Sequence, residues 1–323
     1  MFLNKGPVVQ RENISFATRG SAVQIRSGPK KKIKFLFLLF LLFFNMFSYP
    51  KDIKTDEFSG YFYPSNREEL NSMVDSFLKE AQIEPIDNEI LGIISPHAGY
   101  IYSGKVAGYS YKILSAKKFD TVILLGPSHR YYFEGISIYP EGFFRTPLGD
   151  LEIDDKTTKE FSSLNFVNFN KSFFDGEHCL EVQLPFIIRT LNNVKIVPIL
   201  FGRVFREDLE KLADKLVEIS NSKKILIVVS TDLSHYLTYE EANKFDGETI
   251  EFIKNKDENS ILTPIKEKDL RACGLFPVMT FIKYCKKKNA DIKVLKYLNS
   301  GDTSSNKNRV VGYLSAVMYK KIE

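Results

Sequence analysis

The stretch DTVILLGPSH, residues 120–129, indicates the fold, because a run of apolar residues ends abruptly there at Gly-Pro-Ser-His. A short apolar run bounded by turn residues is typical of a fully buried strand. The stretch EILGIIS at 89–95 has the same form and is followed by Pro-His. Two further runs lie at 195–202 and 223–232. We therefore predict buried strands with polar turns at their carboxyl ends.

Helical patterns lie between and after these runs, at residues 104–116, 179–191, 206–220, 240–255 and 275–288. Pro185 interrupts the pattern at 179–191, so that helix either begins there or is kinked. A last apolar run at 309–319 predicts a final strand, and the polar segment 299–309 before it predicts a loop. Buried strands that alternate with amphipathic helices predict an α/β fold, with a mainly parallel or mixed central sheet and helices on both faces. Ligands of such sheets bind beyond the carboxyl ends of the strands. We expect the functional site at that edge.

Charge is distributed unevenly along the 323 residues. The whole chain carries a net charge of +5, but residues 1–51 hold 9 Lys/Arg and 1 acidic residue, a net of +8. The remainder therefore holds 36 Lys/Arg and 39 Asp/Glu, a net of −3. A mildly acidic body gives no reason to expect nucleic acid as a partner.

The N-terminal region has two parts. Residues 30–47, KKKIKFLFLLFLLFFNMF, place a basic cluster before an apolar run, which predicts a signal peptide or membrane anchor over 30–50. Both remain open, and any membrane contact is expected only through 33–47. Membrane anchoring or export is thus favoured, with a cytoplasmic location as the alternative. Residues 1–29 are interpreted as a start placed too far upstream or a disordered extension, and 51–323 as a single α/β domain.

All four histidines fall in turn-like segments. They are His97 in SPHAGYIYSG, His129 in LLGPSHR, His178 in DGEHCLEVQLPF and His235 in VVSTDLSHY. Histidine ligates metals and transfers protons near neutral pH. A lone histidine is more often an ordinary hydrogen-bonded residue, but four in such positions favour a shared site.

Two further residues allow more than one interpretation. Asp232 lies three residues before His235, and in a helical first turn this spacing would put both side chains on one face. The carboxylate would then orient an imidazole, act as a base, bind metal or cap a helix. Cys273 precedes Gly274, and a free cysteine is usually a small core residue. The spacing of the three cysteines fits neither a disulfide framework nor a CxxC zinc site.

Taken together, these segments resemble the Memo family, known in microbes as protein B of the AmmeMemoRadiSam system. The matching text is SPHAGYIYSG, LLGPSH, RTPLGDLEID, EHCLEVQLPF, STDLSHY, Cys-Gly with Pro277, and VVGYLSA, in family order over about residues 58–319. The resemblance implies a fold similar to that of the class III extradiol (LigB-like) dioxygenases, which are non-haem iron enzymes.

The resemblance also implies roles for individual residues. His97, His129 and Cys273 would hold one transition-metal ion, while Asp232, His235 and His178 would line the same pocket and take part in catalysis. A thiolate among the ligands makes the site softer, which favours Fe(II), Cu or Zn over Mg or Ca. Fe(II) is the ion expected first, with Cu or Zn as alternatives.

The function implied is that of a redox or oxygen-dependent metalloenzyme of unknown substrate. One alternative is a non-catalytic metal-binding or protein-interaction module, and another is a metal-dependent hydrolase. The expected partners are an AMMECR1-like protein and a radical SAM protein, through a functional link, together with an unknown small molecule or peptide.

Overall fold

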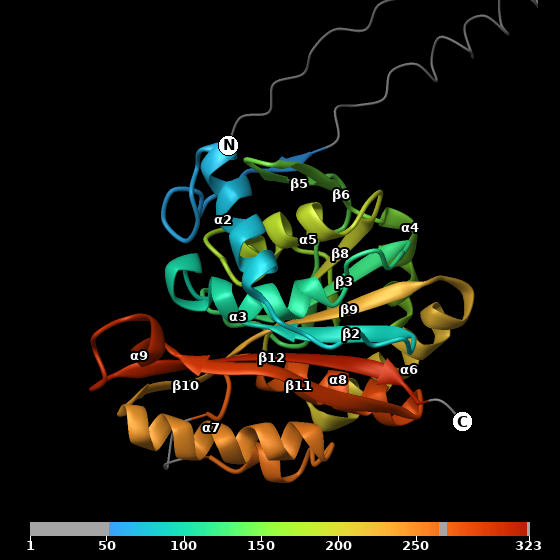
Figure 1. Ribbon diagram of the computed structural model, residues 1–323. Coiled ribbons are helices and arrows are strands. Elements are labelled where there is room, and N and C mark those ends of the chain that lie inside the picture. The colour runs from blue at the N-terminus through green and yellow to red at the C-terminus, as the bar shows by residue number, and fades with distance from the viewer. Residues whose placement is uncertain (1–51, 265–269, 322–323) are drawn as a thin grey trace, which may run out of the picture. The chain divides into compact units, whose positions relative to one another are not determined.

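The computed structural model describes residues 52–264 and 270–321, and its centre is a mixed β-sheet (Figure 1). The middle of the sheet consists of four parallel strands in the order β2-β9-β3-β8, with bounds Ile90–Ser95, Ile225–Ser230, Thr121–Pro127 and Lys195–Phe201. These are the four buried runs predicted from the sequence. Every residue of β2, β3 and β9 is buried, because helices cover both faces of the sheet.

Antiparallel strands extend the sheet on both sides. β12 (Val310–Lys320) pairs with β2, and both β11 (Ala290–Asn299) and β10 (Asp232–Leu237) pair with β12. On the other side β4 (Ile136–Ile138) pairs with β8, and β7 (Val167–Asn168) pairs with β4 in parallel. The sheet is therefore mixed, as the fold-class prediction allowed.

Helices cover both faces of the sheet, and successive strand residues point into different cores. α2 (Arg67–Glu80), α3 (Tyr100–Lys112) and α5 (Leu184–Thr190) lie on the face that receives Ile93 and Val228. The opposite face, which receives Ile94 and Val229, is covered by α6 (Arg206–Ser222) and α8 (Leu275–Lys287). This alternation is the period of two that a strand imposes.

Further elements complete the described part of the fold. A three-stranded sheet comprises β1 (Ile53–Lys54), β5 (Phe143–Thr146) and β6 (Gly149–Glu152). The remaining helices are α4 (Asp155–Glu160), α7 (Tyr239–Lys254), α9 (Ser300–Thr303), and the short 3₁₀ turns η1 (Phe161–Ser163), η2 (Lys171–Phe174), η3 (Glu181–Gln183) and η4 (Ser260–Leu262).

Three local predictions need correction. Asp232 and His235 lie in strand β10, with bulges in its pairing, and not in the first turn of a helix. The helix predicted over 179–191 is shorter, because η3 precedes α5. α5 begins beside Pro185, as one of the two alternatives predicted, and the proline stands in its first turn, where no backbone donor is required. The polar segment 299–309 contains α9, because Asn299 and Asp302 form a capping box there.

None of the helices among the described residues is both long and apolar enough to cross a bilayer. The predicted signal or anchor at 30–50 and the predicted extension at 1–29 lie outside the described residues.

Two helical glycines provide a test of how closely α2 and α3 pack. A Cβ atom added at Gly108 in α3 would lie 2.6 Å from the carbonyl oxygen of Phe77 in α2, whereas one added at Gly247 in α7 would meet nothing within 4 Å. Alanine is favoured over glycine within a helix by about 1 kcal/mol. We expect Gly247→Ala to raise the free energy of unfolding by up to about 1 kcal/mol, and Gly108→Ala to lower it by about 1–3 kcal/mol through overpacking.

Urea denaturation of the full chain and of both variants measures these changes. If Gly108→Ala stabilises the protein as much as Gly247→Ala does, α2 and α3 do not approach as described.

Candidate metal centre

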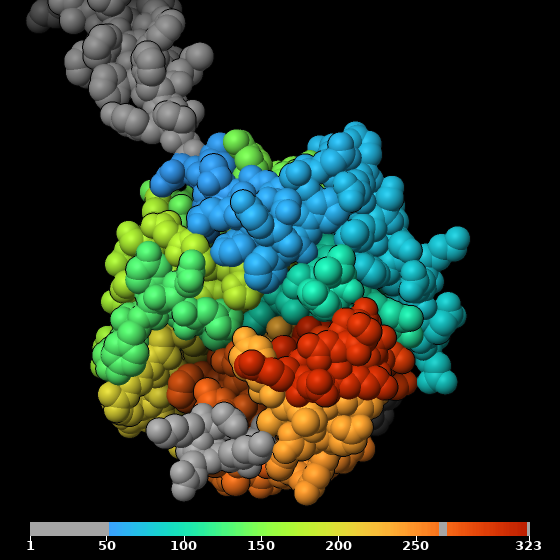
Figure 2. All heavy atoms as spheres, turned by 90° about the vertical axis from the view of Figure 1, so that its left-hand side faces the viewer, coloured from blue at the N-terminus to red at the C-terminus, as the bar shows by residue number. Residues whose placement is uncertain are grey.

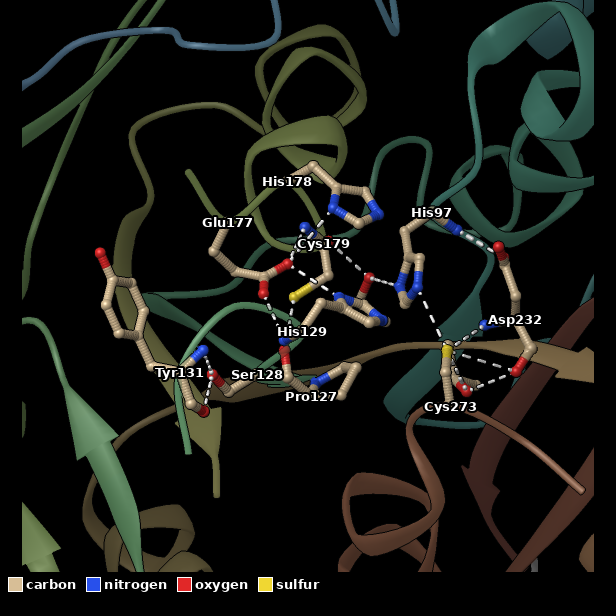
Figure 3. Close-up of polar contacts among 12 residues, drawn as sticks. His97, Pro127, Ser128, His129, Tyr131, Glu177, His178, Cys179, Asp232 and Cys273 are labelled. Carbon is tan, nitrogen blue, oxygen red and sulfur yellow. Dashed lines mark hydrogen bonds and ion pairs between the residues drawn. The ribbon is translucent and has the colours of Figure 1, made fainter. Parts of the chain in front are cut away.

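Three side chains from separate segments meet at the carboxyl edge of the parallel strands (Figure 3). His97 and His129 each lie two residues beyond the end of a strand, β2 and β3 respectively, and Cys273 lies just before α8. One ligand atom from each lies within 4.8 Å of the other two, and Nε2 of His97 is 3.2 Å from Sγ of Cys273. The structure therefore brings together the three residues predicted as metal ligands.

The donor set fits a transition metal. Bond lengths of about 2.0 Å to nitrogen and 2.3 Å to sulfur place two ligands of one tetrahedral ion roughly 3.5 Å apart, close to the separation of His97 and Cys273. Two imidazoles and a thiol favour iron, copper or zinc over magnesium or calcium.

Two backbone N–H groups hold Cys273 against the junction between β9 and β10. Its N–H donates to the carbonyl oxygen of Asp232 at 3.2 Å, and the N–H of Gly274 donates to Oγ1 of Thr231 at 2.9 Å. A Cβ atom at Gly274 would lie 2.7 Å from the Thr231 side chain. Glycine at this position therefore permits the approach that carries the thiol to the histidines.

His129 is held by the buried carboxylate of Glu177. The backbone N–H of His129 donates to Oε2 at 2.6 Å, its ring Nδ1 lies 3.0 Å from Oε1, and Cys179 donates its N–H to Oε1 at 3.0 Å. A carboxylate only accepts, so Nδ1 of His129 carries the proton and Nε2 is free to bind metal.

The charges of this pair reinforce each other. Burial acts to raise the pKa of Glu177, but the hydrogen bonds and charge of His129 outweigh it and hold the pKa at about 2. Burial acts to lower the pKa of His129, but hydrogen bonds with Cys273 and Glu177 outweigh it and raise the pKa to about 10. The raised pKa means that a metal must displace a proton from His129 when it binds.

His97 is buried and is held at two points. Its backbone N–H donates to Oδ1 of Asp232 at 2.8 Å, and its ring Nδ1 lies 3.0 Å from Oγ of Ser230. Burial, together with the neighbouring imidazoles of His129 and His178, lowers the pKa of His97 well below its usual value. The ring is therefore neutral at neutral pH.

Asp232 contacts the site mainly through the backbone. Its carboxylate accepts the N–H of His97, and its own N–H donates to Sγ of Cys273 at 3.2 Å. Burial raises the pKa of Asp232 to about 7, against the lowering effect of the hydrogen bond from His97. Asp232 lies in strand β10 and its carboxylate anchors the turn that carries His97, so it does not cap a helix in its own segment as the capping alternative predicted. Its catalytic role stays a prediction.

Of the other two predicted pocket residues, His178 is shown in contact with two of the ligands. The ring of His178 stacks on that of His129 at 4.9 Å and is 5.3 Å from that of His97, and its pKa is lowered to about 4, chiefly by burial. His235 has its Nδ1 2.8 Å from the carbonyl oxygen of Leu233, and burial lowers its pKa as well. Both imidazoles are neutral near pH 7. Their catalytic roles stay predictions.

Sequence reasoning missed the residues that support the ligands. Glu177 directly precedes His178, and in the sequence alone it is equally compatible with a solvated helix start. Ser230 and Gln183 carried no signal beyond their positions next to predicted site residues. Phe62 covers the outer face of His178 at 4.6 Å, and only the fold brings it there.

Cys179 and Cys285 are structural by their contacts. The buried thiol of Cys179 donates to the carbonyl oxygen of Pro127 at 3.1 Å, and that of Cys285 donates to the carbonyl oxygen of Ala290 at 3.2 Å. Cys179 also lies within ligand distance of His129 and Glu177. We favour the group with Cys273, because Glu177 already accepts three N–H groups and the Cys179 thiol is directed at a backbone carbonyl.

A cavity of about 290 Å³ lies beside Cys273. Its wall includes Tyr131, Tyr132, Arg203 and Phe276. Figure 2 shows this face of the molecule, which is hollowed between the green and the orange segments. A small molecule in the cavity would lie against one of the three candidate ligands.

The sequence profile described as "Memo-like protein" matches residues 55–317. A MEMO1 family protein of Desulfurococcus amylolyticus is 36% identical over 275 residues, which cover 81% of this chain and 97% of the relative. A MEMO1 family protein of Methanobrevibacter smithii is 35% identical and covers 80% and 97%, respectively. An uncharacterized protein from Escherichia coli K12, known from its crystal structure, has a TM-score of 0.44 at 10% identity, covering 72% of this chain and 100% of that one.

The charge on Glu177 should matter for metal binding. Glu177→Gln keeps the shape of the side chain but removes the charge and one acceptor, so one N–H of His129 loses its partner. We expect metal affinity to fall by about 10–100-fold, as is typical for groups that orient a ligand. Competition with a chromophoric chelator measures the affinity. Glu134→Gln removes the same charge from an exposed side chain and is the matched control. Equal affinities for the two variants would contradict the assignment.

Metal affinity should also rise with pH. Imidazole and thiol bind metals only when deprotonated, and the raised pKa of His129 means that metal must displace its proton. For each proton displaced, the apparent affinity should increase about tenfold per pH unit between about pH 6 and 8. Titrations at several pH values measure the slope. A flat profile would indicate carboxylate ligands instead.

Proposed function

The chain belongs to the Memo family, and we propose that it binds one transition-metal ion through His97, His129 and Cys273. The observation that carries this proposal is the meeting of three ligand atoms from separate segments within 4.8 Å. Two of these side chains also have polar partners that hold the ring in place. Ligands held in this way are characteristic of metal sites.

Iron in the Fe(II) state is the ion we propose first, with copper and zinc as alternatives. The mixed nitrogen and sulfur donors suit all three of these ions. Three protein ligands leave coordination positions for a substrate, and a bound ion of this kind supplies Lewis-acid or redox chemistry there.

We propose a redox or oxygen-dependent reaction on a small substrate, with this chain's own residues moving protons. His178 and His235 are neutral, so each can accept a proton near the ligands. Asp232, with a pKa of about 7, exchanges its proton near neutral pH, although its carboxylate also anchors His97. Phe62 covers His178 and keeps water from one side of the ring.

A non-catalytic metal-binding module is the second candidate. It is favoured by the engagement of Asp232, since the carboxylate predicted as a base already accepts the N–H of His97. Oxygen uptake by the anaerobically reconstituted chain, with and without catechols, separates the two. Uptake coupled to loss of the catechol supports the reaction, whereas tight metal binding without turnover supports the module.

We also propose a functional link with an AMMECR1-like protein and a radical SAM protein. Its support is the family to which the chain belongs. Deleting the gene for this chain and that for the radical SAM protein should change the same set of metabolites. Separate sets would remove the link and leave the metal site unaffected.

Removing either of two ligands should abolish metal binding. We expect His97→Ala and Cys273→Ala each to reduce the metal content from about one ion per chain to near zero, because a two-ligand site binds weakly. Cys285→Ala is the matched control, since Cys285 lies on α8, is buried in the core, and is not in the ligand group.

Elemental analysis of the purified chains gives the metal content, and circular dichroism checks that each variant is folded. Full metal occupancy in both ligand variants would refute the proposed site.

A further inference from the structure

The ring of His97 has a partner that does not by itself fix the position of its proton. A hydroxyl both donates and accepts, so Ser230 at 3.0 Å from Nδ1 is compatible with a proton on either ring nitrogen. Only the form with the proton on Nδ1 leaves a lone pair on Nε2, which faces Cys273. The surrounding hydrogen bonds decide between the two forms.

The side-chain amide of Gln183 has one orientation. The atom at its Nε2 position lies 2.9 Å from the carbonyl oxygen of Pro96, and a carbonyl only accepts. That atom must therefore be the NH₂ group, and Oε1 accepts the hydroxyl proton of Tyr111 at 2.9 Å. The same NH₂ group lies 2.9 Å from Oγ of Ser230 and donates to it.

The direction in which the Ser230 hydroxyl donates its single proton is also determined. Oγ lies 2.6 Å from the carbonyl oxygen of Cys179, a distance that two oxygens without a proton between them do not adopt. Ser230 therefore donates to Cys179 and accepts from Gln183. Its remaining contact is with Nδ1 of His97, and this can only be a hydrogen bond that His97 donates.

We propose that Gln183 and Ser230 are positioning residues that hold His97 with its proton on Nδ1, so that Nε2 is open to a metal. This inference rests on the metal centre proposed above and adds to it the groups that select the binding form of the ring. Both side chains are at most 1% exposed, and His97 is 2% exposed. Water therefore cannot readily replace either partner.

The tautomer of His97 with its proton on Nε2 would obstruct the metal site. A proton on Nε2 would point toward Sγ of Cys273 at 3.2 Å, in the direction that a metal must occupy. It would also place the lone pair of Nδ1 against that of Ser230. The two histidines are thus prepared by different means, a carboxylate for His129 and a hydroxyl with a fixed direction for His97.

Long-range ¹H–¹⁵N NMR of the metal-free full chain, labelled with ¹⁵N-histidine, identifies the protonated nitrogen of each ring. The His97 signals are assigned by their loss in His97→Gln. We expect His97 to carry its proton on Nδ1. A proton on Nε2 in the unsubstituted chain would overturn the proposal, whatever the variants show.

Ser230→Ala tests the consequence. Without the acceptor, the Nδ1–H form should lose its preference, and zinc affinity should fall about tenfold or more. Ser110→Ala is the matched control, because Ser110 is also fully buried and its hydroxyl donates to the carbonyl oxygen of Ile94, away from His97. The control should stay within about twofold of the unsubstituted chain.

The outcomes separate this inference from the proposed function. Unchanged zinc affinity in Ser230→Ala would overturn the positioning role while leaving the metal centre in place. The unsubstituted chain could bind neither zinc nor iron while its NMR spectrum places the proton of His97 on Nδ1. In that case the roles of Gln183 and Ser230 are supported and the metal centre is refuted. If Ser230→Ala does not fold, the NMR result on the unsubstituted chain still decides.

Discussion

The site depends on two buried carboxylates, each of which accepts the backbone N–H of a candidate ligand. Asp232 accepts that of His97 and Glu177 that of His129. A turn just beyond a strand would otherwise leave these donors without partners in a buried place, at a cost of about 1–3 kcal/mol each. The same hydrogen bonds fix the backbone position of His97 and His129, and therefore the point from which each side chain extends. The carboxylates do not need to touch a metal to determine its site.

The order of the strands in the sheet also determines where the ligands meet. β2, β3 and β9 are adjacent and parallel, so their carboxyl ends lie at one edge. The sequence predicted these strands because short apolar runs bounded by Gly, Pro and Ser are typical of buried strands. It also indicated that His97 and His129 would share that edge. The antiparallel strand β10 was not predicted, since STDLSHY has a spacing that suits a helical turn as well as a bulged strand.

Long-range partners were the part that the sequence could not reveal. Glu177 lies 48 residues from His129, and Ser230 lies 133 residues from His97. No periodic pattern links residues so far apart in the sequence. The sequence also does not distinguish a buried Asp or Glu from an exposed one. Cys273 joined the prediction only through resemblance to a family, because a free cysteine before a helix is usually a core residue. Its place beside His97 results from two hydrogen bonds that the backbone of residues 273–274 donates to the junction between β9 and β10.

The central claim is that a metal in this protein is bound by two imidazoles and one thiolate. X-ray absorption spectroscopy at the metal edge of the loaded full chain tests it most directly. The account predicts one sulfur neighbour at about 2.3 Å together with imidazole nitrogens at about 2.0–2.1 Å, and loss of the sulfur shell in Cys273→Ser. A first shell of oxygen and nitrogen alone in the unsubstituted chain would contradict it.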